Sequence, residues 1–530
     1  LDGLIKVMTD LDLLWRKSGP QVRDHASHIR NVIKIHLETI ETPQQEMDPD
    51  LEKLRKKMDM KNGGFGTGAK FPLTGALEFL LTEGTDDGFL ALTLDRMARG
   101  GMFDHVEGGF FRCVVDAGWE KPQFEKLLCD NALLASLYSR AAVVFGNGEY
   151  EYTARRTLDF MREKLGFADG AAFFSSIADN GSQEGERYTW EYEEAVRIIG
   201  QPRWPEKYQM TAPGNIIGFG AGEDGGLRTF HTGRNVLARK DKDPDAGSLE
   251  LLRKSRVIPP GQGVDEKIIS AWQGMAMSAF ARAAAAFKDI GYLSTAERIG
   301  GLALELLLDC HFRQDGAPLG SPNLEDGAYL AMGFWDLFEC TGDDRWLQAC
   351  RDRVDSAKAR FSAGDGGYYL EDGEDGVSVR PRNFEDQPYP SAAALLARVD
   401  WRLSFALGQA QRVTHSATSA INLLWALKGG GMLGGEAMSL HREVFCEPVE
   451  ILYSVAGGEQ DLLPWIRSGW SRKWGILRIP LGGSLVNPAL SFGRAPAQAT
   501  RAFVCYDRSC LPPAKTPGEL EGILRKMRYE

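Results

Sequence analysis

Apolar residues recur three and four positions apart along most of the chain, the spacing that places them on one face of an α-helix. Loops rich in glycine, aspartate and proline separate these segments. We therefore expect a mainly α protein of stacked helical hairpins. The pattern predicts helices over residues 22–40, 74–84, 87–99, 124–145, 150–165, 189–199, 265–289, 292–309, 326–340, 343–360, 388–407 and 411–428.

The helix predicted over 124–145 carries several polar residues near its start. Pro122 suits a first helical position, and Glu125 then lies in the first turn, where the helix dipole favours an anion. Glu125 and Asp130 would be separated by about 140° around the helix axis. Two carboxyls acting on one atom would therefore come from different helices, such as Glu125 with Asp265 or Asp326.

The pattern of apolar residues changes from helical to mixed strand and helix near residue 443. The segments REVFCEPVEILYSV (442–455) and WGILRIPL (474–481) are typical of strands, and EQDLLPWIRSGW (459–470) is typical of a helix between them. The sequence therefore predicts a small α/β end-piece after the helical part.

Composition narrows the class of protein and its partners. The chain has 530 residues, of which 43% are hydrophobic and 25% charged, with a formal net charge of −11. These values are typical of soluble globular proteins and disfavour nucleic acid or anionic membranes as partners. There is no uninterrupted run of eighteen apolar residues, so no membrane span is expected.

The eight cysteines are scattered, without CxxC pairs. This arrangement predicts free thiols in a reducing compartment, either the cytoplasm or the interior of an organelle. Cys505 and Cys510 are the closest pair, and we expect them to be free thiols too. The chain has no motif for a metal or a cofactor, and we expect neither.

Six motifs resemble one protein family in their order. The sequence resembles the spermatogenesis-associated protein 20 family, thioredoxin-domain proteins that carry the DUF255 domain, over nearly its whole length. The motifs are GGFGTGAKFP (63–72), DHVEGGFFR (104–112), PQFEKLLCDNALL (122–134), DEKIISAWQGM (265–275), RPRNFEDQPYPS (380–391) and FVCYDRSCLPP (503–513).

The resemblance implies an (α/α)6 toroid of the six-hairpin glycosidase type, distantly similar to N-acylglucosamine 2-epimerases. We expect the toroid over residues 51–440 and the α/β end-piece over 441–530. Residues 1–50 are similar to the tail of the family's thioredoxin-like domain, whose redox cysteine motif does not occur in this sequence. In relatives of this fold the central cavity holds a sugar, so a carbohydrate-like ligand is implied.

Sugar chemistry uses carboxyl pairs, bases and aromatic faces, and the motifs supply candidates for each. The candidate catalytic residues are His105, Glu125, Asp130, Asp265 and Asp326. The candidate ligand-binding residues are Asp104, Arg112, Trp119, Gln123, Trp272, Arg380, Arg382 and Asp386.

Structural roles explain many of these residues equally well. Asp130 and Asn131, inside an apolar helix, can be buried polar residues bonded to neighbouring loops. Arg380 and Arg382 alternate on a predicted strand, so they can be solvated or ion-paired. Tryptophans such as Trp119 and Trp272 are more often core residues than sugar platforms.

The chain also departs from the family's motifs at positions that should line the cavity. Gln123 stands where the family has a histidine, and an amide cannot act as a base near neutral pH. Other departures are Cys129 for tyrosine, Gln273 for asparagine, Gly327 for tyrosine, Gly68-Ala69 for Ala-Pro, and Ala392-Ala393 for Gly-Asn. Two hypotheses follow. The chain is a sugar-binding toroid whose epimerase- or isomerase-like activity is altered or lost, or it is a non-catalytic scaffold in a larger protein assembly.

Overall fold

The structure is a computed structural model that describes residues 2–38, 47–167, 170–178, 185–221, 227–256, 263–373, 379–387, 389–470, 472, 474–491, 494, 499–507 and 509–527. Within these ranges, six helices form a closed inner ring. Each contacts the next, and the last, α16, contacts the first, α3. The inner helices are α3 (Thr74–Glu83), α5 (Leu128–Phe145), α10 (Ser270–Phe287), α12 (Leu324–Thr341), α14 (Ala392–Leu407) and α16 (Gly435–Phe445).

A second layer of amphipathic helices surrounds the ring and leaves one face of each helix to solvent. The outer helices are α2 (Leu51–Arg55), α4 (Asp87–Arg99), α6 (Gly148–Phe160), α11 (Ile290–Leu306), α13 (Asp344–Phe361) and α15 (Ala410–Ala426). A single π-helical turn, Met161–Leu165, extends α6. The predicted (α/α)6 toroid is confirmed.

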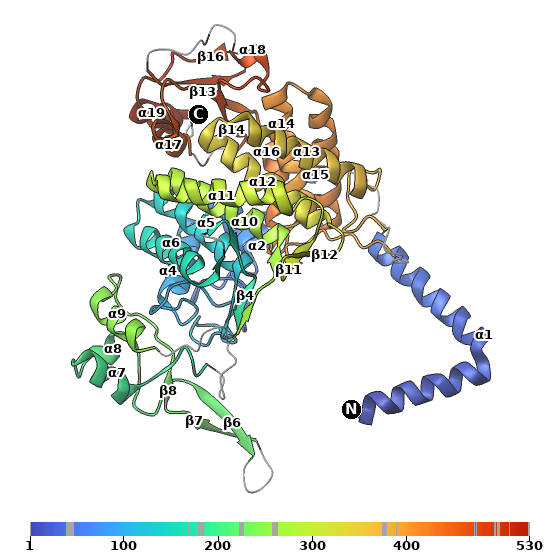
Figure 1. Cartoon of the computed structure of the whole chain (residues 1–530), viewed down its shortest axis with the longest axis vertical. Coiled ribbons are helices and arrows are strands. Elements are labelled where there is room, and N and C mark those ends of the chain that lie inside the picture. The colour runs from blue at the N-terminus through green and yellow to red at the C-terminus, as the bar shows by residue number, and fades with distance from the viewer. Residues whose placement is uncertain are drawn as a thin grey trace.

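Connections of two kinds alternate around the ring. Turns of a few residues lead from inner helices to outer ones, whereas long loops lead from outer helices back to the start of the next inner helix. All long loops therefore gather at the N-terminal ends of the inner helices, an end that we call the mouth. The longest loop region, between α6 and α10, contains α7 (Tyr192–Ile199), α8 (Trp204–Lys207), α9 (Ala246–Ser255) and a β6–β7 ribbon (Ile217–Ala221 with Leu227–His231), which projects from the body (Figure 1).

The predicted helix over 124–145 begins later than expected. Glu125–Leu127 form a strand, β1, that pairs antiparallel with β4 (Ser176–Ala178), and α5 starts at Leu128. The pairing of Glu125–Leu127 with the distant strand β4 outweighs the local helical pattern. In this strand the side chain of Lys126 points inward and forms a buried ion pair with Asp104. The prediction that Glu125 lies on one helix with Asp130 is therefore wrong.

Other predicted boundaries shift in the same way. The segment predicted as helix from residue 265 begins with two short strands, β9 (Val264–Asp265) and β10 (Ile268–Ile269), before α10. The prediction of a strand from residue 442 is wrong for its first part, because α16 continues to Phe445. The boundary expected at residue 440 thus falls inside this last inner helix.

The end-piece is an α/β unit, as the sequence predicts. Strand β13 (Val449–Ser454), helix α17 (Glu459–Ser468) and strand β14 (Ile476–Leu481) form a parallel crossover, and β15 (Arg501–Tyr506) and β16 (Ser509–Cys510) complete a sheet of order β14-β13-β15-β16. Helices α18 (Pro488–Ser491) and α19 (Pro517–Met527) flank it.

The end-piece covers the end of the ring opposite the mouth. Arg478 pairs with Glu339 near the end of α12 at 2.9 Å, and the Trp474 indole donates to Glu83, the last residue of α3, at 2.8 Å. Residues near the C-terminal ends of inner helices are therefore held by the end-piece, while the mouth stays free for the loops.

The expectation of free thiols at Cys505 and Cys510 is wrong. The two residues lie opposite each other on β15 and β16, with a Cα–Cα distance of 4.0 Å, and form a disulfide. The antiparallel hairpin brings the two cysteines together although they are not a CxxC pair. The other six cysteines are free thiols.

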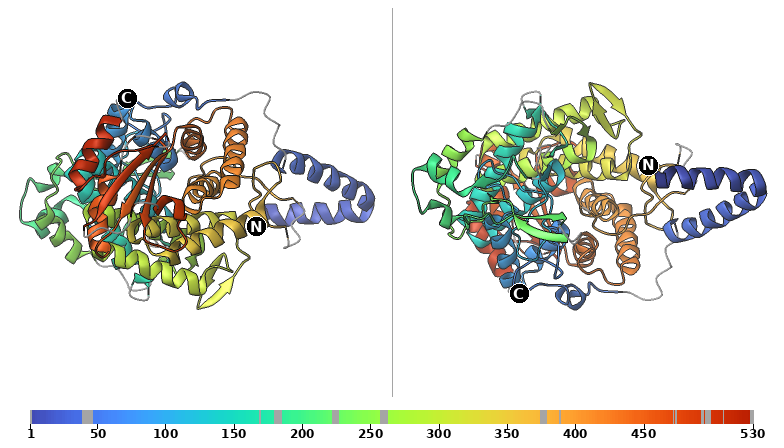
Figure 2. Two further views of the ribbon diagram at one scale, coloured as in Figure 1. Left: turned by 90° about the horizontal axis from the view of Figure 1, so that it is seen from above. Right: turned by 90° about the horizontal axis from the view of Figure 1, so that it is seen from below.

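The N-terminal helix α1 (Asp2–Glu38) stands away from the toroid (Figures 1 and 2). It bends at Ser18, beside Pro20, so that its two arms form an open V. Apolar side chains on both arms are exposed, among them Leu11, Trp15 and Val32. In contrast, α5, the one described helix with the length and apolarity of a membrane span, is an inner helix and 72% of it is buried.

Candidate functional site

Several predicted site residues meet at the mouth, where β1 runs into α5. The Arg112 guanidinium lies 3.6 Å from the Glu125 carboxylate, and both side chains are more than one-third exposed. Arg112 is fixed by its backbone, whose N–H donates to the Glu125 carbonyl at 2.9 Å. A charged pair that is held in place and reachable by solvent suits the hydroxyl groups of a polar ligand.

Asp130, in the first turn of α5, lies beside this pair and is buried. Burial raises the pKa of its carboxyl to about 7, the Arg112 charge lowers it in part, and Glu125 raises it further. Its Oδ2 has no hydrogen-bond partner in the described structure. A carboxyl that changes protonation near neutral pH can either donate or accept a proton.

Two aromatic residues and a third carboxyl complete the mouth cluster. Tyr389 donates from its hydroxyl to Glu325 in the first turn of α12 at 2.7 Å, and it also interacts with the Trp272 side chain and with Cys129, the neighbour of Asp130. Burial raises the pKa of Glu325, although the bond from Tyr389 lowers it in part. Trp272 and Tyr389 are both half-buried, so each keeps some surface for a ligand. We use "mouth cluster" for Arg112, Glu125, Asp130, Trp272, Glu325 and Tyr389.

Gln123 and Asp265 lie close to the mouth cluster. Gln123 is exposed, and its side-chain oxygen accepts from the Cys113 thiol at 3.2 Å. Asp265 lies in the same three-stranded sheet as Glu125 and pairs with Lys267 at 2.6 Å. Since that lysine already neutralises Asp265, its geometry favours an ion pair over a free carboxylate.

Other predicted residues have structural partners away from this cluster. His105 donates from Nε2 to the carbonyl of Arg99 or Gly100, both at 3.1 Å, and burial lowers its pKa to about 4. Asp104 is buried and bound by Lys126 and Arg256, each at 2.8 Å. Burial alone would raise the pKa of Asp104, but these two cations hold it below its usual range.

Trp119 is fully buried, so its ring offers no platform to a sugar. Its indole packs against Lys70, whose ammonium lies 5.8 Å from the ring centre. Its backbone has a positive φ of 67°, an unusual conformation for a bulky residue. Gly64 packs so closely on the indole that a side chain there would collide with it. Trp119 therefore organises the glycine-rich loops from inside.

Two predicted carboxyls fasten inner helices to their neighbours. Asp326 closes a capping box with Asn323, accepts the Ala271 N–H at 3.0 Å and contacts His311 at 2.9 Å. Asp386 accepts the N–H groups of Ser391 and Glu436 at 3.0 and 3.1 Å, and burial raises its pKa to about 7. The hydrogen bonds of Asp326 and Asp386 therefore anchor the loops at the mouth.

Arg380 and Arg382 do not lie on a strand, so that prediction is wrong. Their backbone is irregular, because side-chain contacts rather than a sheet fix this segment. Arg380 stacks on Tyr369 at 4.1 Å and donates to the Glu371 carbonyl. Arg382 makes a two-pronged ion pair with Asp365, both bonds measuring 2.8 Å.

A cavity of about 140 Å3 lies along the ring axis, deeper than the mouth cluster. Its lining combines side chains from all six inner helices with others from the end-piece, including Trp474 and Arg478. Tyr329 lines it beside Pro390, to whose carbonyl it donates at 2.6 Å, and its ring packs edge-on against Tyr389 of the mouth cluster. A space of this volume, lined by charged and polar side chains, can hold water or a small polar molecule.

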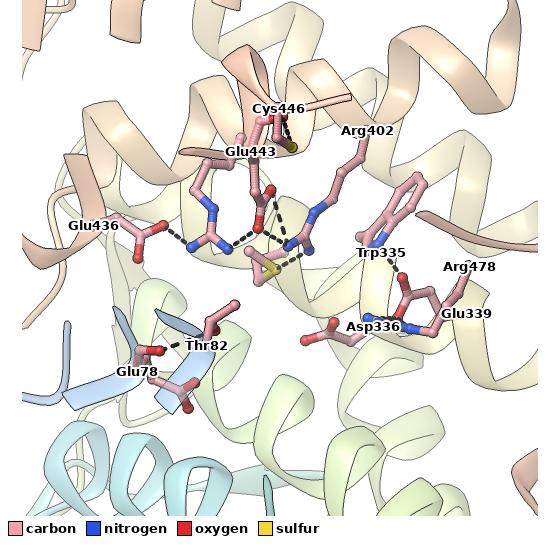
Figure 3. A network of polar contacts seen from close by, with 12 residues as sticks. Glu78, Thr82, Trp335, Asp336, Glu339, Arg402, Glu436, Glu443, Cys446 and Arg478 are labelled. Carbon is pink, nitrogen blue, oxygen red and sulfur yellow. Dashed lines mark hydrogen bonds and ion pairs between the residues drawn. The ribbon is translucent and has the colours of Figure 1, made fainter. Parts of the chain in front are cut away.

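Paired charges surround this axial cavity, and the sequence analysis did not single them out. Figure 3 shows how the carboxylates and arginines face one another across the ring. Glu443 binds both Arg398 and Arg402, and although burial would raise its pKa, these cations lower it to about 2. The other pairs are Arg398–Glu436, Arg282–Asp336, Arg140–Glu78 and Arg478–Glu339. Within the described part of the chain the axial cavity is thus polar but balanced in charge.

Comparisons with known proteins agree with the motifs. No family model matches the chain. Human spermatogenesis-associated protein 20 is 26% identical over 75% of the chain and 59% of its own length, and the mouse protein is 27% identical over 65% of the chain and 51% of its own length. The resemblance to spermatogenesis-associated protein 20 is confirmed. An uncharacterised protein of Caenorhabditis elegans is 23% identical over 99% of the chain and 80% of its own length. The chain therefore spans little more than half the length of the mammalian spermatogenesis-associated protein 20 sequences.

Solved structures with a similar arrangement include sugar-processing enzymes. Cellobiose 2-epimerase from Spirochaeta thermophila is 13% identical, with a TM-score of 0.45 over 75% of the chain and 85% of the enzyme. A D-mannose isomerase is 10% identical, with a TM-score of 0.46 over 70% of the chain and 82% of the enzyme. Because both TM-scores are below 0.5, these similarities carry no argument about the fold. The toroid is established by the closed ring of inner helices in this chain.

Proposed function

We propose that the mouth cluster binds a carbohydrate-like polyol. The observation that carries the proposal is the position of Asp130, a buried carboxyl with a free oxygen beside the exposed Arg112–Glu125 pair. Sugar sites combine charged hydrogen-bonding groups with aromatic faces. Trp272 and Tyr389 supply partly exposed aromatic side chains at the mouth of the toroid.

The reaction class that fits is epimerisation or isomerisation, in which a proton is removed beside a carbonyl group and returned. Gln123 cannot take that proton, because an amide has no pKa near neutrality. Within the mouth cluster, Asp130 has a carboxyl with a pKa of about 7, and Glu325 with the Tyr389 hydroxyl offers a second group that can hold a proton. Proton transfer therefore depends on carboxyls rather than on histidine.

Binding and proton transfer are tested separately. A panel of mono- and disaccharides is titrated by saturation-transfer NMR, and each aldose or ketose is then incubated in D2O to detect deuterium at the carbon next to the carbonyl. We expect R112Q to weaken binding roughly tenfold or more, because a charged hydrogen bond is lost. D130N should keep binding but abolish deuterium incorporation. R203Q, which breaks an exposed pair on α8, is the control.

Absence of binding by every sugar in the panel would reject the sugar-binding proposal. Binding without deuterium incorporation would leave a lectin-like toroid and reject the isomerase chemistry. Equal binding by R112Q and the unaltered chain would place the ligand elsewhere.

A second candidate function, a scaffold in a larger assembly, is favoured by one observation. Helix α1 exposes apolar side chains on both arms, and runs of this kind usually mark surfaces that bind another protein. Replacing Leu11 and Trp15 by Gln should then abolish co-purification of a partner without changing sugar binding. If sugar binding is lost and co-purification persists, α1 serves the mouth instead.

A further inference from the structure

Cys505 and Cys510 lie at the edge of the end-piece sheet. The antiparallel pair β15–β16 places them opposite each other, and β16 is the edge strand. Cys510 is an exposed residue, whereas Cys505 is buried with 7% of its surface accessible. A thiol from solution can therefore approach the disulfide from the side of Cys510.

The guanidinium of Arg494 lies against both sulfur atoms. Its Nη2 is 2.9 Å from Cys510 Sγ and 3.7 Å from Cys505 Sγ. The guanidinium is held in place, because its Nη1 donates to the Leu490 carbonyl at 2.7 Å. A fixed positive charge beside a sulfur stabilises the thiolate that forms when a disulfide opens.

Other charges around the pair do not cancel this arrangement. Glu450 faces Cys505 across β13 and β15, and burial raises the pKa of its carboxyl, while Arg494 lowers it in part. Glu450 is therefore more readily neutral than an exposed glutamate. Asp507, in the turn that joins the two strands, makes no described ion pair with Arg494.

Three of the remaining cysteines are poorly suited to thiol chemistry. Cys129, Cys340 and Cys350 are buried, and burial raises the pKa of each thiol well above its usual value. A neutral, enclosed thiol is a poor nucleophile. The pair on the end-piece, with one exposed sulfur beside a guanidinium, differs from these three thiols.

We propose that Cys505–Cys510 is a reversible redox site that exchanges with external thiols, with Arg494 as a positioning residue. An external thiolate attacks Cys510 Sγ, the sulfur–sulfur bond breaks, and the electron pair goes to Cys505 Sγ, whose thiolate faces Arg494. A second external thiolate attacks the external sulfur of this mixed disulfide and releases Cys510. Two thiols are thereby oxidised to one disulfide, and their two protons are available to the two cysteines.

The test uses the full chain, native and folded, in an excess of reduced glutathione. Samples are alkylated while the chain is folded and are then analysed by peptide mass spectrometry, so that every accessible thiol is followed at once. We expect the Cys505–Cys510 peptide to become labelled while Cys129, Cys340 and Cys350 stay protected. R494Q should slow the reduction by about tenfold, because the thiolate loses its positive neighbour, and R494K should restore most of the rate.

Two results would overturn the proposal. The first is a disulfide that glutathione reduces only after unfolding in urea, which would make the bond purely structural. The second is an equal rate in the unaltered chain, R494Q and R494K, which would remove Arg494 from the chemistry. The variant C505S, checked for folding by circular dichroism, gives the signal of the open pair.

Discussion

The Arg112 guanidinium and the Glu125 carboxylate face each other at 3.6 Å at the mouth of the toroid, and both remain more than one-third exposed. Exposed pairs of this kind add little to stability, since solvent screens the attraction. Arg112 also acts on Asp130, whose pKa it lowers. The pair therefore contributes little to holding the fold, and in the proposed function it contacts the ligand and tunes the buried carboxyl.

Replacing Arg112 should separate these roles. We expect R112Q to change the free energy of unfolding by less than about 1 kcal/mol, because the pair is exposed. The same change should raise the pKa of Asp130 above 7, since a neighbouring positive charge is lost. Carbon-detected NMR titration of the Asp130 carboxyl measures this shift. A lower pKa in R112Q would contradict the assigned electrostatics.

Asp130 should also leave a signature in the pH dependence of stability. Folding raises the pKa of its carboxyl from the usual 3.8 to about 7, so the folded protein holds this proton more tightly than the unfolded chain does. Stability from this group is therefore full below pH 4, falls as the pH rises towards 7, and then stays constant, a change of up to roughly 4 kcal/mol.

Urea unfolding at pH 4.5 and pH 7.5 compares the unaltered chain with two variants. D130N should show a smaller loss of stability between the two pH values, because its amide does not titrate. D24N on the exposed helix α1 should behave like the unaltered chain. An unchanged difference in D130N would show that the carboxyl is not desolvated.

The ion pairs around the axial cavity should be strongly coupled to folding. R398A removes the partner of both Glu436 and Glu443, leaving buried carboxylates without their shared cation. We expect a loss of about 3–5 kcal/mol in the free energy of unfolding. R203Q, which breaks an exposed pair on the surface, should leave the free energy of unfolding nearly unchanged. Equal costs in the two variants would mean that water screens the axial pairs.

Two glycines offer a matched pair for testing how closely the ring is packed. A side chain at Gly274 on α10 would lie 2.4 Å from the backbone of Tyr329 on α12, whereas one at Gly301 on α11 would meet nothing within 4 Å. G274A should therefore destabilise by about 1–3 kcal/mol through overpacking. G301A should stabilise by roughly 0.5–1 kcal/mol, as in any exposed helix interior. Thermal unfolding of both variants gives the comparison, and a stable G274A would contradict the close approach of the two helices.

The helical pattern could be predicted because apolar spacing is a local property, and the toroid because its motifs keep their order. Glu125 shows the limit, since the strand that it joins is defined by a partner some fifty residues away. The disulfide escaped prediction for the same reason, because only the paired strands bring Cys505 opposite Cys510.

The sequence predicted only some of the residues that the structure brings together at the mouth. Arg112, Glu125, Asp130 and Trp272 belong to the mouth cluster, but Asp104 and His105 from the same motifs turn inward to structural partners. Motif membership does not say which way a side chain points. Glu325 stood next to a predicted residue, and the axial charges could have been suspected from arginines within apolar helices, such as Arg398 and Arg402 on α14.

The contact between α3 and α16 has a consequence for how the chain folds. These helices lie near opposite ends of the toroid sequence, yet each needs the other to cover its inner face. During synthesis on the ribosome, the early helical hairpins cannot close the ring until residues 435–445 of α16 have emerged. Ring closure is thus a late, long-range step, and chains interrupted before α16 should be held in an aggregation-prone, unclosed state.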